Sequence, residues 1–159
     1  FWNANERRAK AERLGLTIPE VITLASIVEE ETNYQPEKSR VAGLYLNRLR
    51  KGIRLQSDPT VKFALEDFAL NRILFEHLKV DDPYNTYKYA GLPPGPIRLP
   101  SVATIDAVLN AEKHNYIYMC AHPDFNGTHN FAVTLAEHNR NAAKYHVALR
   151  KWLAEKKKK

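Results

Sequence analysis

Signals for helix starts and helix stops recur along this sequence, and they constrain its fold more than any other feature. Thr17 and Glu20 have the spacing of a capping box, in which two side chains satisfy backbone N–H groups at a helix start. Thr134 and Glu137 repeat that spacing, and Gly52 follows a basic turn as a C-terminal glycine cap does. The predicted helices cover residues 5–13, 18–32, 36–51, a segment from 58 onward, 68–78, 101–110 and about 20 residues after 134.

Three short segments have the pattern of strands. Residues 53–56 alternate apolar and polar side chains, as a half-buried strand does. Residues 116–121 predict a buried strand, and a turn over 122–127 leads to a second strand over 128–131, which together predict a hairpin. A chain of 159 residues is the size of one domain. We therefore predict an α+β fold, a helix-rich single domain with a small antiparallel sheet.

The net charge of +6 does not by itself indicate nucleic-acid binding. Residues 156–159 supply four of the 24 positive charges, which leaves 20 against 18 acids for the rest of the chain. A terminal lysine run is typical of a solvated tail, and no helix-turn-helix or zinc-finger motif is present. We expect no nucleic-acid partner. The predicted organisation is a lead-in helix (1–15), a core (16–153) and a basic tail (154–159), in one domain over 1–159.

Three consecutive acids end the predicted helix over 18–32. At about 100° per residue, Glu30 points away from the apolar stripe, whereas Glu29 and Glu31 lie on its two margins. Partial burial and the negative end of the helix dipole both favour the protonated form of the Glu31 carboxyl. A general acid needs that form. The alternative is a solvated helix end without chemistry.

Two further segments have residue types that suit a site. Gln56 and Asp58 lie where the predicted strand meets a helix, although Ser57 or Asp58 as the helix cap, with Pro59 behind it, explains this segment equally well. Aromatic faces beside hydrogen-bonding side chains suit sugars, and this mixture occurs at Tyr84, Asn85, Thr86 and Tyr87. A turn with its tyrosines folded onto the core is the alternative.

Two other features bear on function. Between residues 81 and 100, prolines and glycines predict a long ordered loop, and such loops are often functional. Histidine and aspartate side chains can bind a metal ion if the fold brings them together, and the candidates for such a site are His122, Asp124, His129 and His138. No His-x-x-x-His or Cys-x-x-Cys spacing fixes two ligands on one element, so we predict no metal and no cofactor.

Several ordered blocks, spread from about Leu16 to Leu149, resemble the catalytic domain of the endolytic murein (peptidoglycan) transglycosylases, the MltG or YceG-like family. Residues 66–80 fit that family less tightly. The blocks are LASIVEEET (24–32), NRLRKG (47–52), LQSDPTV (55–61), PYNTY (83–87), GLPPGPI (91–97), GTH (127–129) and LAEHN (135–139).

The resemblance implies a reaction and a catalytic residue. The family's catalytic glutamate directly precedes a threonine in a Glu-x-Glu-Thr block, which is the position of Glu31. It implies cleavage of the β-1,4 bond between N-acetylmuramic acid and N-acetylglucosamine without water, leaving a 1,6-anhydro end, with Glu31 acting first as acid and then as base. Asp58 is assigned to positioning. The candidates for holding the glycan are Glu29, Gln56, Asp58, Tyr84, Asn85, Thr86 and Tyr87.

The resemblance also implies a setting. Family members usually carry an N-terminal transmembrane helix and a small LysM-like domain, and this chain, which opens on Phe1, has neither and is expected to be a soluble, excised catalytic part. The implied place of the full protein is the bacterial cell envelope, anchored at the outer face of the cytoplasmic membrane. Its partners would be peptidoglycan strands and cell-wall synthases. The alternatives are a non-catalytic glycan-binding or synthase-partner module, and a metal-dependent hydrolase that uses the histidines.

Overall fold

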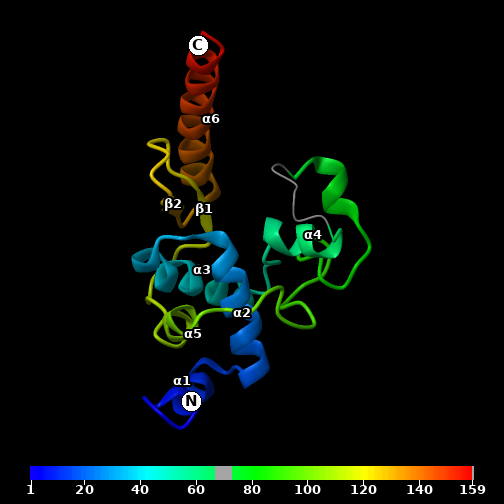
Figure 1. Ribbon diagram of the computed structural model, residues 1–159, viewed down its shortest axis with the longest axis vertical. Helices are drawn as coiled ribbons and strands as arrows, with labels where there is room; N and C mark the ends of the chain where they lie inside the picture. Colours follow the sequence, from blue (N-terminus) through cyan, green and yellow to red (C-terminus); the bar gives the residue numbers. More distant parts are fainter. Residues whose placement is uncertain (67–72, 159) are drawn as a thin grey trace. The chain divides into compact units, whose positions relative to one another are not determined.

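The computed structural model describes residues 1–66 and 73–158 (Figure 1). The chain divides into two compact units, Phe1–Lys113 and His114–Lys159. The three consecutive acids, the Pro/Gly loop and all predicted glycan-holding residues belong to the first unit. The single domain expected over 1–159, with its core and tail boundaries, stays a prediction.

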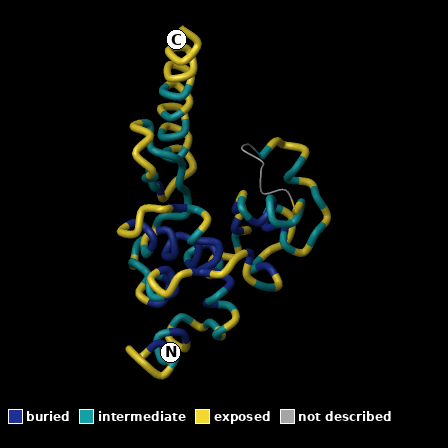
Figure 2. Tube along the Cα trace, in the orientation of Figure 1, coloured by how far each residue is buried: buried dark blue, intermediate teal, exposed yellow. Residues whose placement is uncertain are grey.

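The core of the first unit lies where three helices meet: α2 (Ile18–Glu31), α3 (Lys38–Lys51) and α5 (Val102–Leu109) pack on one another. Figure 2 shows buried residues concentrated along α2 and α3. A further helix, α1 (Arg7–Leu14), contacts α5 and α2, while α4 (Asp58–Ala64) contacts α2. Burying apolar side chains drives this packing, and the fully buried ones include Val21, Leu24, Ile27, Val28, Val41, Val61 and Val108.

Most predicted helix ends are confirmed, because caps form from nearby residues. The Thr17 N–H donates to the Glu20 carboxylate at 3.0 Å, and the Glu20 N–H donates to Thr17 Oγ1 at 3.3 Å, which completes the capping box. Gly52 ends α3 in the left-handed region, with φ of 68°. The Ser101 hydroxyl accepts from the Thr104 N–H at the start of α5.

The strand expected over residues 53–56 is wrong. The described strands all lie in the second unit. A strand needs a neighbour that exchanges several backbone hydrogen bonds, whereas this segment has one such bond to the loop, from the Gln56 N–H to the Thr86 carbonyl at 3.3 Å. Gln56 also has a φ of 53°, which ends the extended backbone.

Two other expected helices begin or extend differently. A short 3-10 helix, η1 (Gln35–Glu37), stands where the sequence predicts a helix start, and α3 begins after it. Of the helix expected over 68–78, residues 68–72 lie outside the described residues, and the rest falls partly in the 3-10 helix η2 (Phe75–Lys79). Residues 81–100 form no helix or strand, which confirms the predicted loop.

The second unit is the predicted hairpin followed by the predicted long helix. Strand β1 (Tyr118–Ala121) pairs antiparallel with β2 (His129–Ala132), with Tyr118 opposite Ala132. Helix α6 (Leu135–Lys157) packs on both strands, and its Thr134 cap accepts from the Glu137 N–H. Together with the helices of the first unit, this confirms a helix-rich α+β fold with a small antiparallel sheet. None of the described helices is both long and apolar enough to span a membrane.

Candidate active site

Glu31 is the last residue of α2, and its half-buried carboxyl is held by two hydroxyl groups. The Tyr45 hydroxyl, from the middle of α3, donates to Glu31 Oε1 at 2.8 Å. The Ser57 hydroxyl, from the residue before α4, donates to the same oxygen at 2.7 Å. Both donors are almost fully buried. Three segments of the chain therefore converge on one carboxylate oxygen and fix its orientation.

Both donors are neutral hydroxyls, and the surroundings of Tyr45 keep its hydroxyl protonated. Burial raises the pKa of Tyr45 well above its ordinary value of 10, and the negative charge of Glu31 raises it further. Ser57 occupies the N-cap position of α4, as one of the sequence alternatives has it. Its side chain nevertheless makes no capping hydrogen bond. The hydroxyl expected to cap the helix is directed to Glu31 instead.

A second group of polar side chains lies beside Glu31. The Arg48 guanidinium donates to the Arg54 carbonyl at 2.7 Å and to Gln56 Oε1 at 3.3 Å. The Tyr87 hydroxyl donates to Asp58 at 2.5 Å. Burial raises the pKa of Tyr87 far above its ordinary value, and the hydrogen bond to Asp58 and the charge of Glu31 raise it further. Gln56, Asp58 and Tyr87, all predicted from sequence, thus gather around Glu31 and Arg48.

Two other predicted residues are buried and fasten the loop. Asn85 is fully buried, and its amide donates to the Leu78 and Val80 carbonyls at 2.9 and 2.8 Å. The Thr86 hydroxyl accepts from the Ser57 N–H at 2.9 Å and lies 2.8 Å from the Thr60 hydroxyl. These bonds attach the loop to the start of α4, and so they set where the neighbouring tyrosines lie.

Tyr84, also predicted from sequence, packs against an aromatic ring of α4. Its ring packs on Phe63 with the ring centroids 4.6 Å apart. Its hydroxyl lies where the loop passes at Gly95, so that a side chain at Gly95 would come within 3.2 Å of it. The loop therefore presents Tyr84 with one face already in contact with α4.

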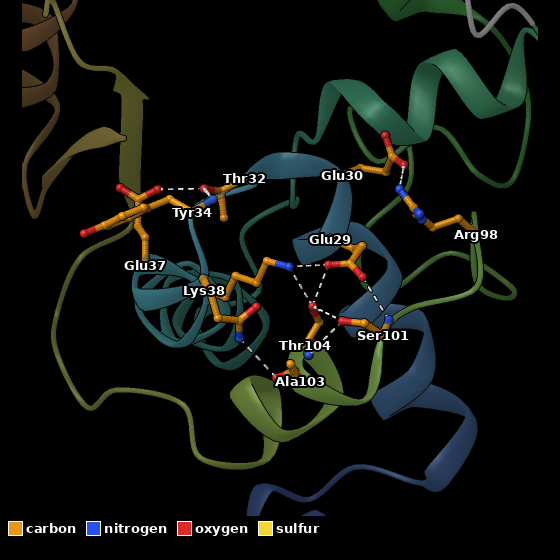
Figure 3. Close-up of polar contacts among 11 residues, drawn as sticks. Glu29, Glu30, Thr32, Tyr34, Glu37, Lys38, Arg98, Ser101, Ala103 and Thr104 are labelled. Carbon is orange, nitrogen blue, oxygen red and sulfur yellow. Dashed lines mark hydrogen bonds and ion pairs between the residues drawn. The ribbon is translucent and has the colours of Figure 1, made fainter. Parts of the chain in front are cut away.

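Glu29 has a different environment from Glu31, although both are half-buried, as expected at the margins of the apolar stripe of α2. Its carboxylate pairs with the Lys38 ammonium and accepts from the Thr104 hydroxyl at 2.6 Å and the Ser101 N–H at 2.9 Å (Figure 3). Burial alone would raise the pKa of Glu29, but the hydrogen bonds from Lys38, Thr104 and Ser101 lower it to about 2. The pair ties the end of α2 to α3 and α5.

The residues after Glu31 are fixed as well. The Thr32 hydroxyl donates to the Glu37 carboxylate at 3.0 Å and accepts from the Tyr34 N–H at 3.1 Å (Figure 3). Thr32 and Glu37 are both buried. Glu30, by contrast, is exposed and pairs with Arg98 at 2.7 Å, which agrees with its predicted outward direction. Glu31 therefore lies in the chain between two polar networks, the one around Glu29 and the one that joins Thr32 to Glu37.

Several residues of this cluster are not among the sequence candidates. Tyr45 is placed by its periodicity on the inward face of a helix, and a buried tyrosine usually has a partner for its hydroxyl. That was the available signal. Nothing in the sequence pairs Lys38 with Glu29 or Arg48 with Gln56, because each pair joins different elements. The described residues contain no group of three or more His, Cys, Asp or Glu side chains able to hold a metal ion, so the four metal candidates do not gather.

The Glu29–Lys38 pair yields a prediction about stability. We expect Glu29→Ala to lower the free energy of unfolding at pH 7 by about 3 kcal/mol, because it leaves a buried ammonium without its carboxylate. The double variant Glu29→Leu/Lys38→Met should recover most of that loss. Urea unfolding measures both. Glu112→Ala, which breaks the exposed pair with Arg40, is the control and should cost less than about 1 kcal/mol.

The same pair predicts a pH dependence. The folded pKa of about 2 lies below the ordinary value of 4.5, so the stabilisation is complete above pH 4.5 and is lost as the pH falls towards 2. The difference in unfolding free energy between the wild type and Glu29→Gln should therefore narrow over that window. A difference that stays constant down to pH 2 would contradict the assignment.

Comparison with known proteins places the chain in a family. A model of the YceG-like family matches residues 1–144. The endolytic murein transglycosylase of Bacillus subtilis (strain 168) is 36% identical over 138 residues, 87% of this chain and 38% of that protein. The endolytic murein transglycosylase of Streptococcus pneumoniae (strain D39) is 34% identical over 134 residues, 82% of this chain and 24% of that protein.

The fold agrees with a solved structure. The crystal structure of a YceG-like protein from Listeria monocytogenes matches with a TM-score of 0.78 at 37% sequence identity, over 87% of this chain and 44% of that one. The chain thus spans less than half the length of each of these relatives. The match to the family model covers most of the chain, and the three consecutive acids, the side chains around Arg48 and the Pro/Gly loop all lie inside it. The chain belongs to the YceG-like family.

Proposed function

We propose that this chain cleaves the glycan strands of peptidoglycan as a lytic transglycosylase, with Glu31 as its catalytic residue. The observation that carries the proposal is the Glu31 carboxyl at the end of α2, which accepts hydrogen bonds from the buried hydroxyls of Tyr45 and Ser57. Hydroxyl donors fix the orientation of a carboxyl and leave it able to exchange a proton. The names of the two bacterial relatives support the choice of substrate.

The proposed reaction consists of two proton transfers at one carboxyl. Glu31 first protonates the oxygen that links C1 of N-acetylmuramic acid to N-acetylglucosamine, as the C1–O bond breaks. The resulting carboxylate then takes the proton of the muramoyl 6-hydroxyl, whose oxygen bonds to C1 and closes the 1,6-anhydro ring. Glu31 ends protonated, and no water is consumed. Hydrogen bonds from Tyr45 and Ser57 stabilise the carboxylate between the two transfers.

The neighbouring side chains are assigned to holding the strand. Tyr84 and Tyr87 offer aromatic faces on which sugar rings stack, and Gln56 and Asp58 offer hydrogen-bonding groups to hydroxyls and amides. Asn85 and Thr86 act by fixing the loop, and Glu29 by fixing the end of α2. The hydrogen bond from Tyr87 supports a positioning role for Asp58. One carboxyl that acts first as acid and then as base suffices for the proposed reaction, which therefore needs no second catalytic carboxylate of the kind that hydrolases use.

The cellular setting is a separate part of the proposal. It places the full protein in the bacterial cell envelope, anchored at the outer face of the cytoplasmic membrane, where peptidoglycan strands and cell-wall synthases are its partners. This setting rests on the family resemblance.

The first prediction from the proposed function concerns the catalytic role of Glu31. Glu31→Gln keeps the shape of the side chain but cannot donate the proton, so we expect turnover on purified glycan strands to fall by about 10³-fold, as general acid–base catalysis implies. Mass spectrometry of released anhydro-muropeptides measures it. Glu12→Gln, an exposed acid on α1, is the matched control and should leave turnover unchanged. Near-normal turnover of Glu31→Gln would refute the assignment and make Glu29 the next residue to test.

The second prediction concerns the product. All new strand ends should carry 1,6-anhydromuramic acid, because the 6-hydroxyl and not water attacks C1. A predominance of reducing ends in the same mass spectra would point to a hydrolase that uses a second carboxylate, Asp58 first. Intact strands that the protein binds but never cuts would favour the non-catalytic glycan-binding module.

The third prediction concerns pH. Turnover should fall on the alkaline side as Glu31 loses its proton. Ser57→Ala and Tyr45→Phe each remove a donor that stabilises the carboxylate, so the alkaline limb of the pH–rate profile should move to higher pH in both variants. A fall in rate at every pH, with no movement of the limb, would show that the two hydroxyls act only on the fold.

The fourth prediction concerns metal ions. The proposed proton transfers ask nothing of a cation, so activity should survive exhaustive treatment with EDTA. Loss of activity with EDTA and its recovery with zinc would move the chemistry to His122, His129 and His138.

A further inference from the structure

A pocket of about 420 Å³ lies next to the candidate catalytic residue in the first unit. It is formed by the end of α2, one face of α4 and the last part of the Pro/Gly loop. Its lining residues are Glu30, Pro59, Lys62, Phe63, Ile97, Arg98 and Leu99. Glu31 is not among them, although Glu30 precedes it and Ser57, which bonds it, lies within one helical turn of Pro59. The pocket therefore lies close to Glu31, between residues next to it and residues next to its hydrogen-bond donor.

The lining combines apolar side chains with two cations, Lys62 and Arg98, and one carboxylate, Glu30. Pro59 and Ile97 are apolar, and the Phe63 ring packs on Tyr84. Leu99 is 89% exposed, which leaves a large apolar side chain in water at the edge of the pocket. Such a surface is suited to small apolar groups of a ligand, because binding them removes both apolar surfaces from water.

The charges on the walls favour an anion. Within the part of the chain that the structure describes, no carboxylate lies within ion-pair distance of the half-buried Lys62. Arg98 does have a partner, Glu30, but both side chains of that pair are more than two-fifths exposed. An exposed pair contributes little stability, so Arg98 can exchange its partner for a ligand carboxylate at little cost.

We propose that this pocket binds the peptide branch of the N-acetylmuramic acid residue at which Glu31 acts, with the Lys62 ammonium pairing with a carboxylate of that peptide. This inference rests on the proposed function. Each muramoyl residue can carry, on its lactyl group, a short peptide that joins alanine methyl groups to free carboxylates. That branch leaves the strand sideways from the sugar whose C1 reacts. A pocket close to the Glu31 carboxyl, lined by apolar side chains and by two cations against one carboxylate, matches this branch in both place and chemistry.

The test compares two forms of one substrate. Uncrosslinked glycan strands are used with their peptides and after an amidase has removed the peptides, and kcat/KM is measured on both. We expect Lys62→Met to lower kcat/KM about tenfold on peptide-bearing strands, mainly through KM, as loss of a charge-assisted contact implies. On strands without peptides, Lys62→Met should have the same kcat/KM as the wild type. Lys62→Arg should restore most of the loss, and Lys51→Met, at the exposed end of α3, is the matched control.

A binding measurement separates the pocket from the chemistry. The dipeptide L-alanyl-γ-D-glutamate is titrated into the wild type and into Lys62→Met by calorimetry, and only the wild type should bind it. Equal binding, or an equal loss of kcat/KM on both kinds of strand, would overturn the inference while the cleavage of stripped strands keeps the proposed function. If the wild type cuts neither strand, the proposed function fails, and the titration still decides whether the pocket takes the peptide.

Discussion

The buried pair between Glu29 and Lys38 is the interaction on which the geometry around Glu31 depends. A carboxylate near the C-terminal end of a helix is unfavourable there, because the helix dipole places partial negative charge at that end. Lys38, Thr104 and Ser101 offset this cost and the cost of burial with three hydrogen bonds to Glu29, from α3, α5 and the residue before α5. A helix end that would fray in isolation is thereby held against two neighbours.

Three consecutive glutamates have three environments, and the environments separate their roles. Glu29 is paired with a buried ammonium, which holds its pKa near 2 and its charge constant over the working pH range. Glu30 faces water and shares an exposed pair with Arg98. Glu31 receives hydrogen bonds from two buried hydroxyls, which orient its carboxyl. Residue type is the same in all three, so the difference comes from the partners that the fold supplies.

The loop over residues 81–100 depends on a different device. A segment without helix or strand must satisfy its backbone groups by other means. The Asn85 side chain accepts from the Tyr87 N–H within the loop and donates to the Leu78 and Val80 carbonyls just before it. Thr86 joins the loop to Ser57, the residue that also bonds Glu31. The loop, the start of α4 and the candidate catalytic carboxyl are therefore linked through a short chain of hydrogen bonds. Tyr87 reaches Asp58 as a consequence.

What the sequence by itself determined is local. The caps at Thr17, Gly52 and Ser101, the hairpin after residue 116 and the position of Glu31 at a helix end could all be predicted, because each depends on residues within a few positions or on a periodic pattern. The tertiary structure alone decided that Ser57 bonds Glu31, 26 residues away, instead of capping α4. It also decided that Glu29 meets Thr104, 75 residues away, and that residues 53–56, with no neighbouring strand, remain irregular. A cap closes within one turn of chain, whereas these contacts exist only after distant helices have packed.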